Sequence, residues 1–456
     1  MEKSNQSNLP VAIIGGGPVG LAAAAHLAQK GENFILFEAG MTVGANILEW
    51  GHVKMFSPWH YNIDKASREL LEMSGWKSPN ENLLPTGKEL VEEYLLPLSR
   101  LKEMQDKIVL NARVVGVARK ELDKLKNAKR DNAPFQLYVD TDGETKVVEA
   151  KAVIDSSGTW TNPNPSLSNG IWTNAEQSLK AHIYYGIPNV YSLEDRYKNK
   201  TVMVIGSGHS AINALLELVV LKEKYPNTKI FWAMRKLHVK EAYGGQENDG
   251  LQARGELGIR IQKMVESEQI RVLTPFYIYN LKGINGKISV TGNLDSNEVS
   301  IQDIDELVVS TGFRPDVSFL SEIRINLDSA VESVEALAPL IDPNIHSCGT
   351  VRPHGEEELR QPEKNFYIVG MKSYGRAPTF LLATGYEQVR SIVAYLTGDL
   401  EGAKEVHLEL PETGVCRTNI ESNCCSTETN ITQIESQSCC ETKPLPLNKM
   451  SNSCCS

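Results

Sequence analysis

The stretch VAIIGGGPVGLAAAAHLAQKGENFILFEAG, residues 11–40, decides the fold. Its apolar start is typical of a buried strand, and its alanine-rich middle favours a helix. A second apolar run follows and ends at Glu38. Gly15, Gly17 and Gly20 stand between the first strand and the helix with G-x-G-x-x-G spacing. This order predicts a βαβ unit that binds a dinucleotide.

Each residue of this loop has a distinct expected role. Gly15 permits the tight turn, Gly17 lets the pyrophosphate approach the backbone, and Gly20 lets the helix pack closely on the strand. The helix N-terminus faces the phosphates. Glu38 lies eighteen residues after Gly20, where a carboxylate accepts the hydrogen bond of the ribose 2′-hydroxyl. We therefore predict that these four residues bind a cofactor.

A second unit of the same kind spans residues 200–236, KTVMVIGSGHSAINALLELVVLKEKYPNTKIFWAMRK. Gly206 and Gly208 are followed by Ala211, which gives the G-x-G-x-x-A form of the loop. We interpret His209, inside this loop, as a packing or backbone-bonding residue rather than an acid–base catalyst. Two loops predict two nucleotides, a flavin at the first and a nicotinamide at the second.

The end of the second unit indicates which nicotinamide nucleotide is used. Its last strand runs into Arg235 and Lys236, and no acid occupies the position that matches Glu38. A guanidinium there suits a 2′-phosphate, which favours NADPH over NADH. The alternative is that Arg235 is simply a surface arginine.

This layout resembles the two-dinucleotide-binding flavoproteins, which use FAD in the first site and NADPH in the second. The segments AVIDSSGTW (152–160) and ELVVSTGFRPD (306–316) look like the crossovers between the two domains of that superfamily. FYIVGMKSYG (366–375) looks like its late flavin-contacting strand. That strand normally ends in Gly-Asp, whose aspartate contacts the ribityl chain, whereas Met371 follows Gly370 here and replaces that aspartate.

The resemblance implies an α/β fold with two Rossmann-like domains, of which the flavin domain is discontinuous. We expect an FAD-binding part at 9–165, an inserted NAD(P)-binding domain at 166–305, and a second FAD-binding part at 306–405. The segment 411–456 is rich in Ser, Thr and Asn, so its composition does not support a core, and we expect a flexible tail.

Composition narrows the class of partners. The net charge of −10 argues against a nucleic-acid binder, which would carry a basic surface. No segment approaches the roughly 20 consecutive apolar residues that span a bilayer, so no membrane partner is expected. The first residues lack the pattern of a signal peptide, so we expect a cytoplasmic protein with reduced thiols. The oligomeric state is not predicted.

The eight cysteines are placed unevenly, because none precedes Cys348 and seven lie from Cys416 onward. Flavin disulfide reductases need a redox cysteine pair beside the flavin, and neither dinucleotide unit has one. A mechanism of the glutathione-reductase or thioredoxin-reductase kind is thereby excluded unless the tail is the electron acceptor. Reaction of the reduced flavin with oxygen, or direct reduction of a small substrate, remains.

The arrangement resembles the class B flavoprotein monooxygenases, in which NADPH reduces FAD and a soft nucleophile takes one oxygen atom of O₂. Those enzymes usually carry F-x-G-x-x-x-H-x-x-x-(F/Y/W) before the second glycine loop. The segment LKAHIYYGIPNVY has His182 but no Phe-x-Gly ahead of it, and Gly186 occupies the aromatic position. The typical substrates of that class therefore do not carry over.

A resemblance over nearly the whole chain is to FAD-dependent, monooxygenase-like proteins associated with bacterial arsenic resistance. It is carried by VIGSGHSAINALLEL (204–218), LAPLIDPNIHSCGTVRPHGEEEL (337–359), GMKSYGRAPTFLLATGYEQVRSI (370–392), LPETGVC (410–416) and the tail. It implies a trivalent arsenical, such as methylarsenite, as the substrate. Trivalent arsenic has a lone pair that can attack an electrophilic oxygen, and soft thiolates select soft metals and metalloids.

Four residues are candidates for catalysis. Cys348, the cysteine of the folded body, could bind substrate as a thiol or be plain packing. Arg352 and His354 could assist catalysis or form charge pairs. Arg376 follows a strand expected to reach the flavin and could contact flavin or substrate. Further candidates for cofactor contacts are Ser57, Val115, Gly158, Gly312, Tyr374, Gly375 and Gly385.

Three adjacent-cysteine pairs stand fifteen residues apart in the tail: Cys424 and Cys425, Cys439 and Cys440, Cys454 and Cys455. Adjacent cysteines form a strained ring when oxidised together, and no histidine at zinc-ligand spacing accompanies them. We predict that they bind a metalloid or soft metal, with an appendage of no role as the alternative.

Three functions stay open at this point. The first is a monooxygenase that oxidises a trivalent arsenical with NADPH and O₂ while the tail gathers substrate. The second is a reductase that passes electrons to a metal ion held by the tail thiols. The third is a soft-metal-binding protein whose flavin body acts on another sulfur or nitrogen substrate.

Overall fold

The computed structural model describes residues 8–344, 354–378 and 380–408. Two five-stranded sheets dominate it, and every strand pairing within them is parallel. The first sheet has the order β16-β7-β1-β2-β3. Its strands are β1 (Val11–Ile14), β2 (Phe34–Phe37), β3 (Ile108–Val109), β7 (Ala152–Asp155) and β16 (Phe366–Ile368). The sheet thus joins segments from both ends of the described chain.

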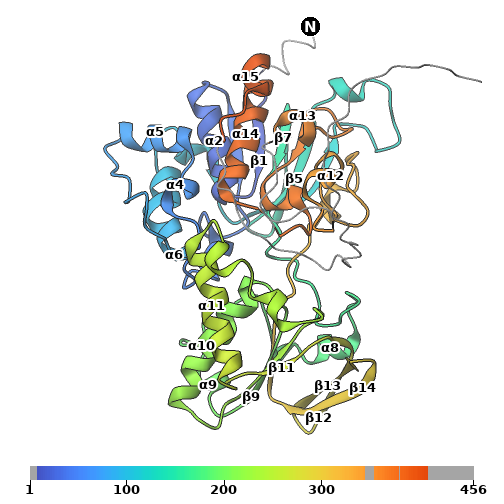
Figure 1. Ribbon diagram of the computed structural model, residues 1–456. Helices are drawn as coiled ribbons and strands as arrows, with labels where there is room; N and C mark the ends of the chain where they lie inside the picture. The colour runs from blue at the N-terminus through green and yellow to red at the C-terminus, as the bar shows by residue number, and fades with distance from the viewer. Residues whose placement is uncertain (1–7, 345–353, 379, 409–456) are drawn as a thin grey trace, which may run out of the picture. The chain divides into compact units, whose positions relative to one another are not determined.

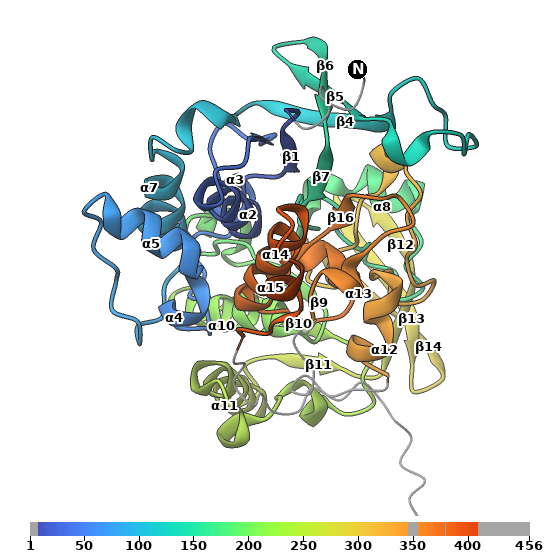
Figure 2. The ribbon, with the colours of Figure 1, turned by 90° about the horizontal axis from the view of Figure 1, so that it is seen from above.

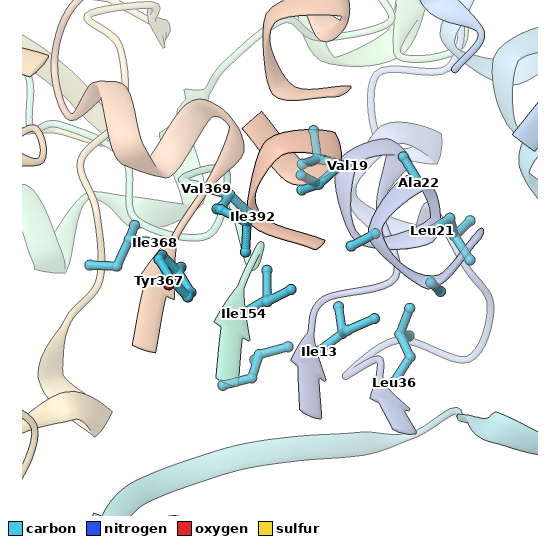
Figure 3. Close-up of a cluster of buried hydrophobic side chains, with 14 of the residues drawn as sticks. Ile13, Val19, Leu21, Ala22, Leu36, Ile154, Tyr367, Ile368, Val369 and Ile392 are labelled. Atoms are coloured by element: carbon cyan, nitrogen blue, oxygen red, sulfur yellow. The ribbon is translucent and has the colours of Figure 1, made fainter. Parts of the chain in front are cut away.

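Two helices pack against this sheet and position its glycine loop. They are α2 (Pro18–Gln29) and α14 (Leu382–Leu396), which lie side by side in both ribbon views (Figures 1 and 2). Figure 3 shows Val19 and Leu21 of α2 and Ile392 of α14 above Ile13 and Ile154 of the strands. Because these strands are covered, their sequences are continuous apolar runs rather than alternating ones.

Shorter helical segments follow the first βαβ unit and flank the late strand. They are α3 (Ala45–Leu48), α4 (Trp59–Asn62), α5 (Lys65–Met73), α6 (Gly87–Glu89), α7 (Leu96–Ser99), α12 (Ala338–Ile341), α13 (Glu356–Leu359) and α15 (Leu400–Lys404). Asp64 caps α5, since its side chain accepts a hydrogen bond from the backbone N–H of Ser67 at 2.8 Å.

The second sheet has the order β11-β10-β9-β15-β8. Its strands are β8 (Ile183–Tyr185), β9 (Thr201–Ile205), β10 (Lys229–Ala233), β11 (Arg271–Leu273) and β15 (Glu306–Val309). The helices of this region are α8 (Asn174–Ser178), α9 (Glu194–Tyr197), α10 (His209–Lys224) and α11 (Gln252–Glu266). Buried residues of α10 and α11 pack with those of β9 and β10 into one core.

Two three-stranded antiparallel sheets complete the structure. One consists of β4 (Ala112–Arg119), β5 (Phe135–Thr141) and β6 (Glu144–Ala150), and the other of β12 (Phe276–Ile284), β13 (Lys287–Leu294) and β14 (Asn297–Ile304). Each stands in the chain just before the strand that returns to its parallel sheet, β7 or β15.

The predicted fold class, with two Rossmann-like parallel α/β units, is confirmed. The predicted domain boundaries stay predictions. Near one of them, β15 begins at Glu306 and pairs with β9 and β8, so the second sheet extends past residue 305. Within the described ranges, no helix has the length and apolar character needed to cross a membrane.

Candidate functional site

The first glycine loop leads from β1 into α2, and its glycines differ in what surrounds them. A Cβ on Gly15, whose φ is +102°, would lie 2.8 Å from the carbonyl oxygen of Ser156. A Cβ on Gly20 would lie 2.0 Å from the carbonyl oxygen of Gly15. Neither position has room for a side chain, because the loop, α2 and the end of β7 pack backbone to backbone.

Gly17 has the opposite character. Its φ is −81°, which any residue adopts, and nothing lies within 4 Å of an ideal Cβ. Gly17 is also the N-cap of α2, so the unpaired N–H groups of the first helical turn lie beside this open space. An anion such as a pyrophosphate fits a helix N-terminus of this kind.

Glu38 lies across the loop from this space. Its carboxylate accepts hydrogen bonds from the backbone N–H groups of Gly16 and Gly40, both at 2.7 Å. These bonds fix the orientation of the carboxylate at the end of β2. Each oxygen keeps a lone pair that can accept a ribose hydroxyl. The residues present therefore fit the ribose and pyrophosphate of a dinucleotide.

A cavity of about 250 Å³ opens at this loop, and we call it the first-loop cavity. Its lining comes from the loop, the segment before and after α3, the end of β7 and the turn after β16. The lining residues are Gly15, Gly17, Pro18, Val19, Glu38, Gly44, Ala45, Asn46, Ile47, Trp50, Met55, Leu90, Ser156, Ser157, Gly158, Thr159, Trp160, Gly370, Met371, Phe380 and Leu382. Apart from Glu38, none of these side chains titrates.

Trp160 forms an aromatic wall of the cavity. Its Nε1–H donates a hydrogen bond to Glu49 at 2.7 Å, and its ring stacks on Phe313 with a centroid separation of 4.6 Å. Gly186, with φ +104°, lies beside it, and a Cβ there would be 3.0 Å from Cη2 of Trp160. The glycine at the aromatic position of the class B pattern thus leaves room for Trp160. The glycine is visible in the sequence, but no local pattern indicates that Trp160 lies against it.

The turn after β16 holds a buried ion pair, which is a second feature that no local sequence pattern predicts. Lys372 is completely buried and pairs with Asp155, the last residue of β7, at 2.6 Å. Met371 lines the cavity at the position where the superfamily has its aspartate. A lysine is almost never fully buried without a partner, and nothing in the local pattern indicates that this one is.

His354 is buried behind the same turn. Its Nε2 lies 2.9 Å from the side-chain nitrogen of Gln388, whose oxygen accepts a hydrogen bond from the backbone N–H of Gly370 at 2.7 Å. Its ring centroid is 5.5 Å from that of Tyr374, a fully buried residue whose pKa is raised by burial. Arg376 is exposed. The structure therefore brings His354 and Tyr374 together and leaves Arg376 on the surface.

The second glycine loop repeats the geometry of the first. A Cβ on Gly206, whose φ is +132°, would lie 2.3 Å from the carbonyl oxygen of Ser310, just after β15. Gly208, the N-cap of α10, has φ −90° and nothing within 4 Å of an ideal Cβ. Ala211 is fully buried in α10. This loop also offers an open helix N-terminus to a phosphate.

The residues around this loop set its electrostatics. Burial and the nearby Arg254 lower the pKa of His209 to about 4, so its ring is neutral at pH 7. Arg235 is exposed after β10 and donates a hydrogen bond to the backbone carbonyl of Ser168 at 3.1 Å. Lys236 donates to the backbone carbonyl of Glu241 at 2.8 Å. Arg235 can still bond a phosphate, because a guanidinium has five donors.

Replacing Arg235 with glutamine is expected to raise the KM for NADPH about tenfold to a hundredfold, because a hydrogen bond to a charged group contributes about 1.5–3 kcal/mol. The KM for NADH is expected to stay unchanged. Steady-state kinetics with both nucleotides measure this. Lys229→Gln, an exposed change at the other end of β10, is the matched control. Equal changes in both KM values would contradict the 2′-phosphate role of Arg235.

The other sequence-predicted contacts are scattered. Ser57 is buried and donates a hydrogen bond to the side chain of Asn62 at 2.9 Å, and Val115 is exposed on β4. Glycine is required at Gly375, where a Cβ would lie 2.3 Å from the carbonyl oxygen of Val331, and at Gly385, where one would lie 2.5 Å from Val19. Gly158 and Gly312 both have positive φ, and of the six predicted contacts in this paragraph only Gly158 lines the first-loop cavity.

Several candidates lie outside the described residues: Cys348, Arg352, Cys424, Cys425, Cys439, Cys440, Cys454 and Cys455. Among the residues that the structure does describe, no group of three or more His, Cys, Asp or Glu could hold a metal ion. The catalytic and metal-binding roles of all these residues stay predictions, as do the individual cofactor contacts.

Several known proteins are similar to this chain in sequence or in fold. The ferredoxin–NADP reductase of Lactobacillus johnsonii is 24% identical over 345 residues, which cover 74% of this chain and 85% of that protein. The bacillithiol disulfide reductase of Bacillus cereus has the same fold, with a TM-score of 0.61, 21% identity and coverage of 86% of this chain and 99% of that one.

A cadaverine monooxygenase of Erwinia amylovora, solved with FAD bound, is also similar, with a TM-score of 0.62 and 13% identity over 90% of this chain and 99% of that one. The model of the pyridine nucleotide-disulphide oxidoreductase family matches residues 12–348, well over half of the chain. The prediction of an FAD- and NADP(H)-dependent oxidoreductase is thereby confirmed. The chain belongs to the pyridine nucleotide-disulphide oxidoreductase family.

Proposed function

We propose that this protein is a flavin-dependent monooxygenase that uses NADPH and O₂ to oxidise a trivalent arsenical, such as methylarsenite, to its pentavalent form. In the overall reaction NADPH and arsenic each lose two electrons. The four electrons reduce O₂, and one of its oxygen atoms binds arsenic. The other oxygen atom leaves as water, which takes one proton from the medium and the hydrogen that NADPH transfers. FAD binds at the first glycine loop and NADPH at the second.

The observation that carries this proposal is the lining of the first-loop cavity. Its described walls are mostly apolar or aromatic, and the polar side chains among them are Glu38, Asn46, Ser156, Ser157 and Thr159. No cysteine occurs anywhere in residues 1–347. The part of the cavity that the structure describes therefore offers no thiol to relay electrons to a disulfide. FAD supplies the redox chemistry when bound, and the chain supplies orientation and exclusion of water.

The residues of this chain then have defined tasks. Gly17 and the N-terminus of α2 bind the pyrophosphate, and Glu38 binds the ribose. Trp160, stacked on Phe313, and Met371 exclude water from the cavity. Exclusion of water favours transfer of oxygen to the substrate over its release as peroxide, because side reactions need solvent access.

The arsenical is proposed from the tail and from the family resemblance in the sequence. Six cysteines in three pairs provide soft thiolates, and trivalent arsenic is a soft, thiophilic centre. Thiols that bind the arsenical on the same chain as the flavin site would raise its effective concentration for that site. The proposed monooxygenase activity is supported by the presence of a cadaverine monooxygenase among the similar structures.

A second function is favoured by a different observation. The similar proteins also include ferredoxin–NADP reductases and bacillithiol disulfide reductases, which are named for electron transfer to an external acceptor. In this alternative, NADPH reduces the flavin and the electrons pass to a soft metal ion held by the tail thiols. Oxygen is then not required.

One experiment separates the two functions. NADPH oxidation by the FAD-loaded protein is followed with and without methylarsenite, in air and under nitrogen. The full-length variant with all six paired cysteines changed to serine is compared with Cys416→Ser, a cysteine outside the pairs. The proposal expects methylarsenite-stimulated turnover only in air, and a raised KM for the arsenical in the six-serine variant. Turnover under nitrogen that is lost in that variant would support the reductase instead.

A further inference from the structure

An ion pair is buried behind the wall of the first-loop cavity. Nζ of Lys372 lies 2.6 Å from Oδ2 of Asp155, and both side chains are completely shielded from solvent. Asp155 is the last residue of β7, and Lys372 lies in the turn that follows β16. Since β7 and β16 are parallel neighbours, their carboxyl ends meet at the edge of the sheet where the cavity opens.

Three neighbours surround the ammonium group of Lys372. Besides Asp155, its ammonium donates a hydrogen bond to Oγ of Ser157 at 3.0 Å and lies 4.6 Å from the ring centroid of Phe319. Replacing a buried ion pair by apolar residues of similar volume is often neutral or stabilising. Stability alone therefore does not account for a fully buried charge pair at this position.

The hydroxyl group of Ser157 links the pair to the lining of the cavity. Ser157 lines the cavity, and it donates both its backbone N–H, at 3.1 Å, and its Oγ–H, at 2.6 Å, to Oδ1 of Asp155. The same Oγ accepts from Lys372. Met371, the neighbour of Lys372 in the chain, also lines the cavity. Both charges thus act on the cavity from a position shielded from solvent, where electrostatic effects are strong.

We propose that Lys372 is a positioning residue for the flavin chemistry: with Asp155 it fixes Ser157 against the cofactor, and each of the two charges shifts the reduction potential of the bound FAD in the opposite direction to the other. This inference rests on the proposed placement of FAD in the first-loop cavity. Reduction adds electrons to the flavin, so a fixed ammonium favours the reduced form and a fixed carboxylate disfavours it. The native pair balances these two effects.

The test is the midpoint potential of the FAD-loaded protein, measured under nitrogen without arsenical. Lys372→Met is expected to lower the equilibrium constant for two-electron reduction about tenfold, which is about 30 mV. Asp155→Asn is expected to raise it by a similar factor. The double variant is expected to return to within about threefold of the native value. A purely structural latch would instead shift both single variants in the same direction, and that result, or no shift in either, overturns the proposal.

Two conservative variants keep the test decisive if a charge variant does not fold. Lys372→Arg retains the cation and is expected to keep the native potential, and Ser157→Ala retains both charges while removing the hydroxyl. Ser157→Ala is expected to loosen FAD binding with a smaller potential shift than either charge variant. A native potential and native FAD affinity in Ser157→Ala would overturn the positioning role. Because no oxygen or arsenical is present, a wrong assignment of substrate leaves these results unchanged.

Discussion

Replacing Gly17 with alanine is expected to remove FAD from the protein without unfolding it, while Gly208→Ala is expected to spare FAD and weaken NADPH. Both glycines are N-caps with negative φ, and an added Cβ meets nothing within 4 Å at either position. The protein itself therefore tolerates alanine at both places. Only a phosphate that approaches the backbone there would collide with the new methyl group.

The size of this effect follows from the bonds that are lost. Hydrogen bonds from backbone N–H groups to a charged phosphate contribute about 1.5–3 kcal/mol each, which corresponds to about tenfold to a hundredfold in affinity. FAD content is measured by absorbance after gel filtration, and NADPH affinity by the KM. The two variants form a reciprocal pair, so each is the control for the other.

A third variant tests the close packing of the first glycine loop at Gly20. Gly20→Ala would place its Cβ 2.0 Å from the carbonyl oxygen of Gly15, so it is expected to destabilise the fold as well as lose FAD. If Gly17→Ala keeps its FAD and Gly208→Ala loses it, the assignment of the two nucleotides to the two loops is wrong.

Glu363→Gln is expected to destabilise the protein by about 3–5 kcal/mol, because it leaves buried cations without their counter-charge. The carboxylate of Glu363 bonds the guanidinium groups of Arg119 and Arg130, both at 2.7 Å, and all three side chains are at most 3% exposed. Arg119 also stacks on Phe135, with its guanidinium carbon 3.7 Å from the ring centroid. The cluster joins β4 and the segment before β5 to the segment before β16.

Chemical denaturation of the FAD-loaded protein measures this loss. The matched control is Glu401→Gln, since Glu401 is 90% exposed and pairs with Lys404 only at 3.9 Å. An exposed pair of this kind contributes between about 0 and 1 kcal/mol, so the control is expected to be nearly native. A loss below 1 kcal/mol in Glu363→Gln would show that the buried cluster does not hold these segments together.

The same cluster predicts a pH dependence. Burial alone would raise the pKa of Glu363, but the hydrogen bonds from Arg130 and Arg119 outweigh it and hold the pKa below the ordinary value of 4.5. The stabilisation is therefore complete above about pH 5 and is lost as the pH falls through the lowered pKa. The free energy of unfolding of the native protein is expected to fall more steeply below pH 4.5 than that of Glu363→Gln.

The glycine loops could be predicted because their requirements are local. The spacing of Gly15, Gly17 and Gly20 between a strand and a helix already fixes which position must be tight and which must be open. The atoms that crowd Gly15 come from Ser156 and Ser157, however, and those that crowd Gly206 come from Ser310. The sequence indicated the crossover segments that carry these serines, but not that they touch the loops.

Long-range pairs were beyond prediction for a simple physical reason. Lys372 and Asp155 are 217 positions apart, and Arg119 and Glu363 are 244 apart, so no local pattern links them. Arg130 stands in a charged stretch of sequence that suggests a surface loop, yet its side chain is buried and forms an ion pair with Glu363. Trp160 is similar, because its place in the cavity depends on a missing side chain at Gly186, in another part of the chain.

The most direct test of the central claim is the stoichiometry of the products. The FAD-loaded protein is supplied with NADPH, O₂ and methylarsenite in the presence of catalase, which removes free peroxide. The account predicts one pentavalent methylarsenate formed for each NADPH and each O₂ consumed, and none under nitrogen. Consumption of NADPH without methylarsenate, or methylarsenate formation that continues without oxygen, would contradict it.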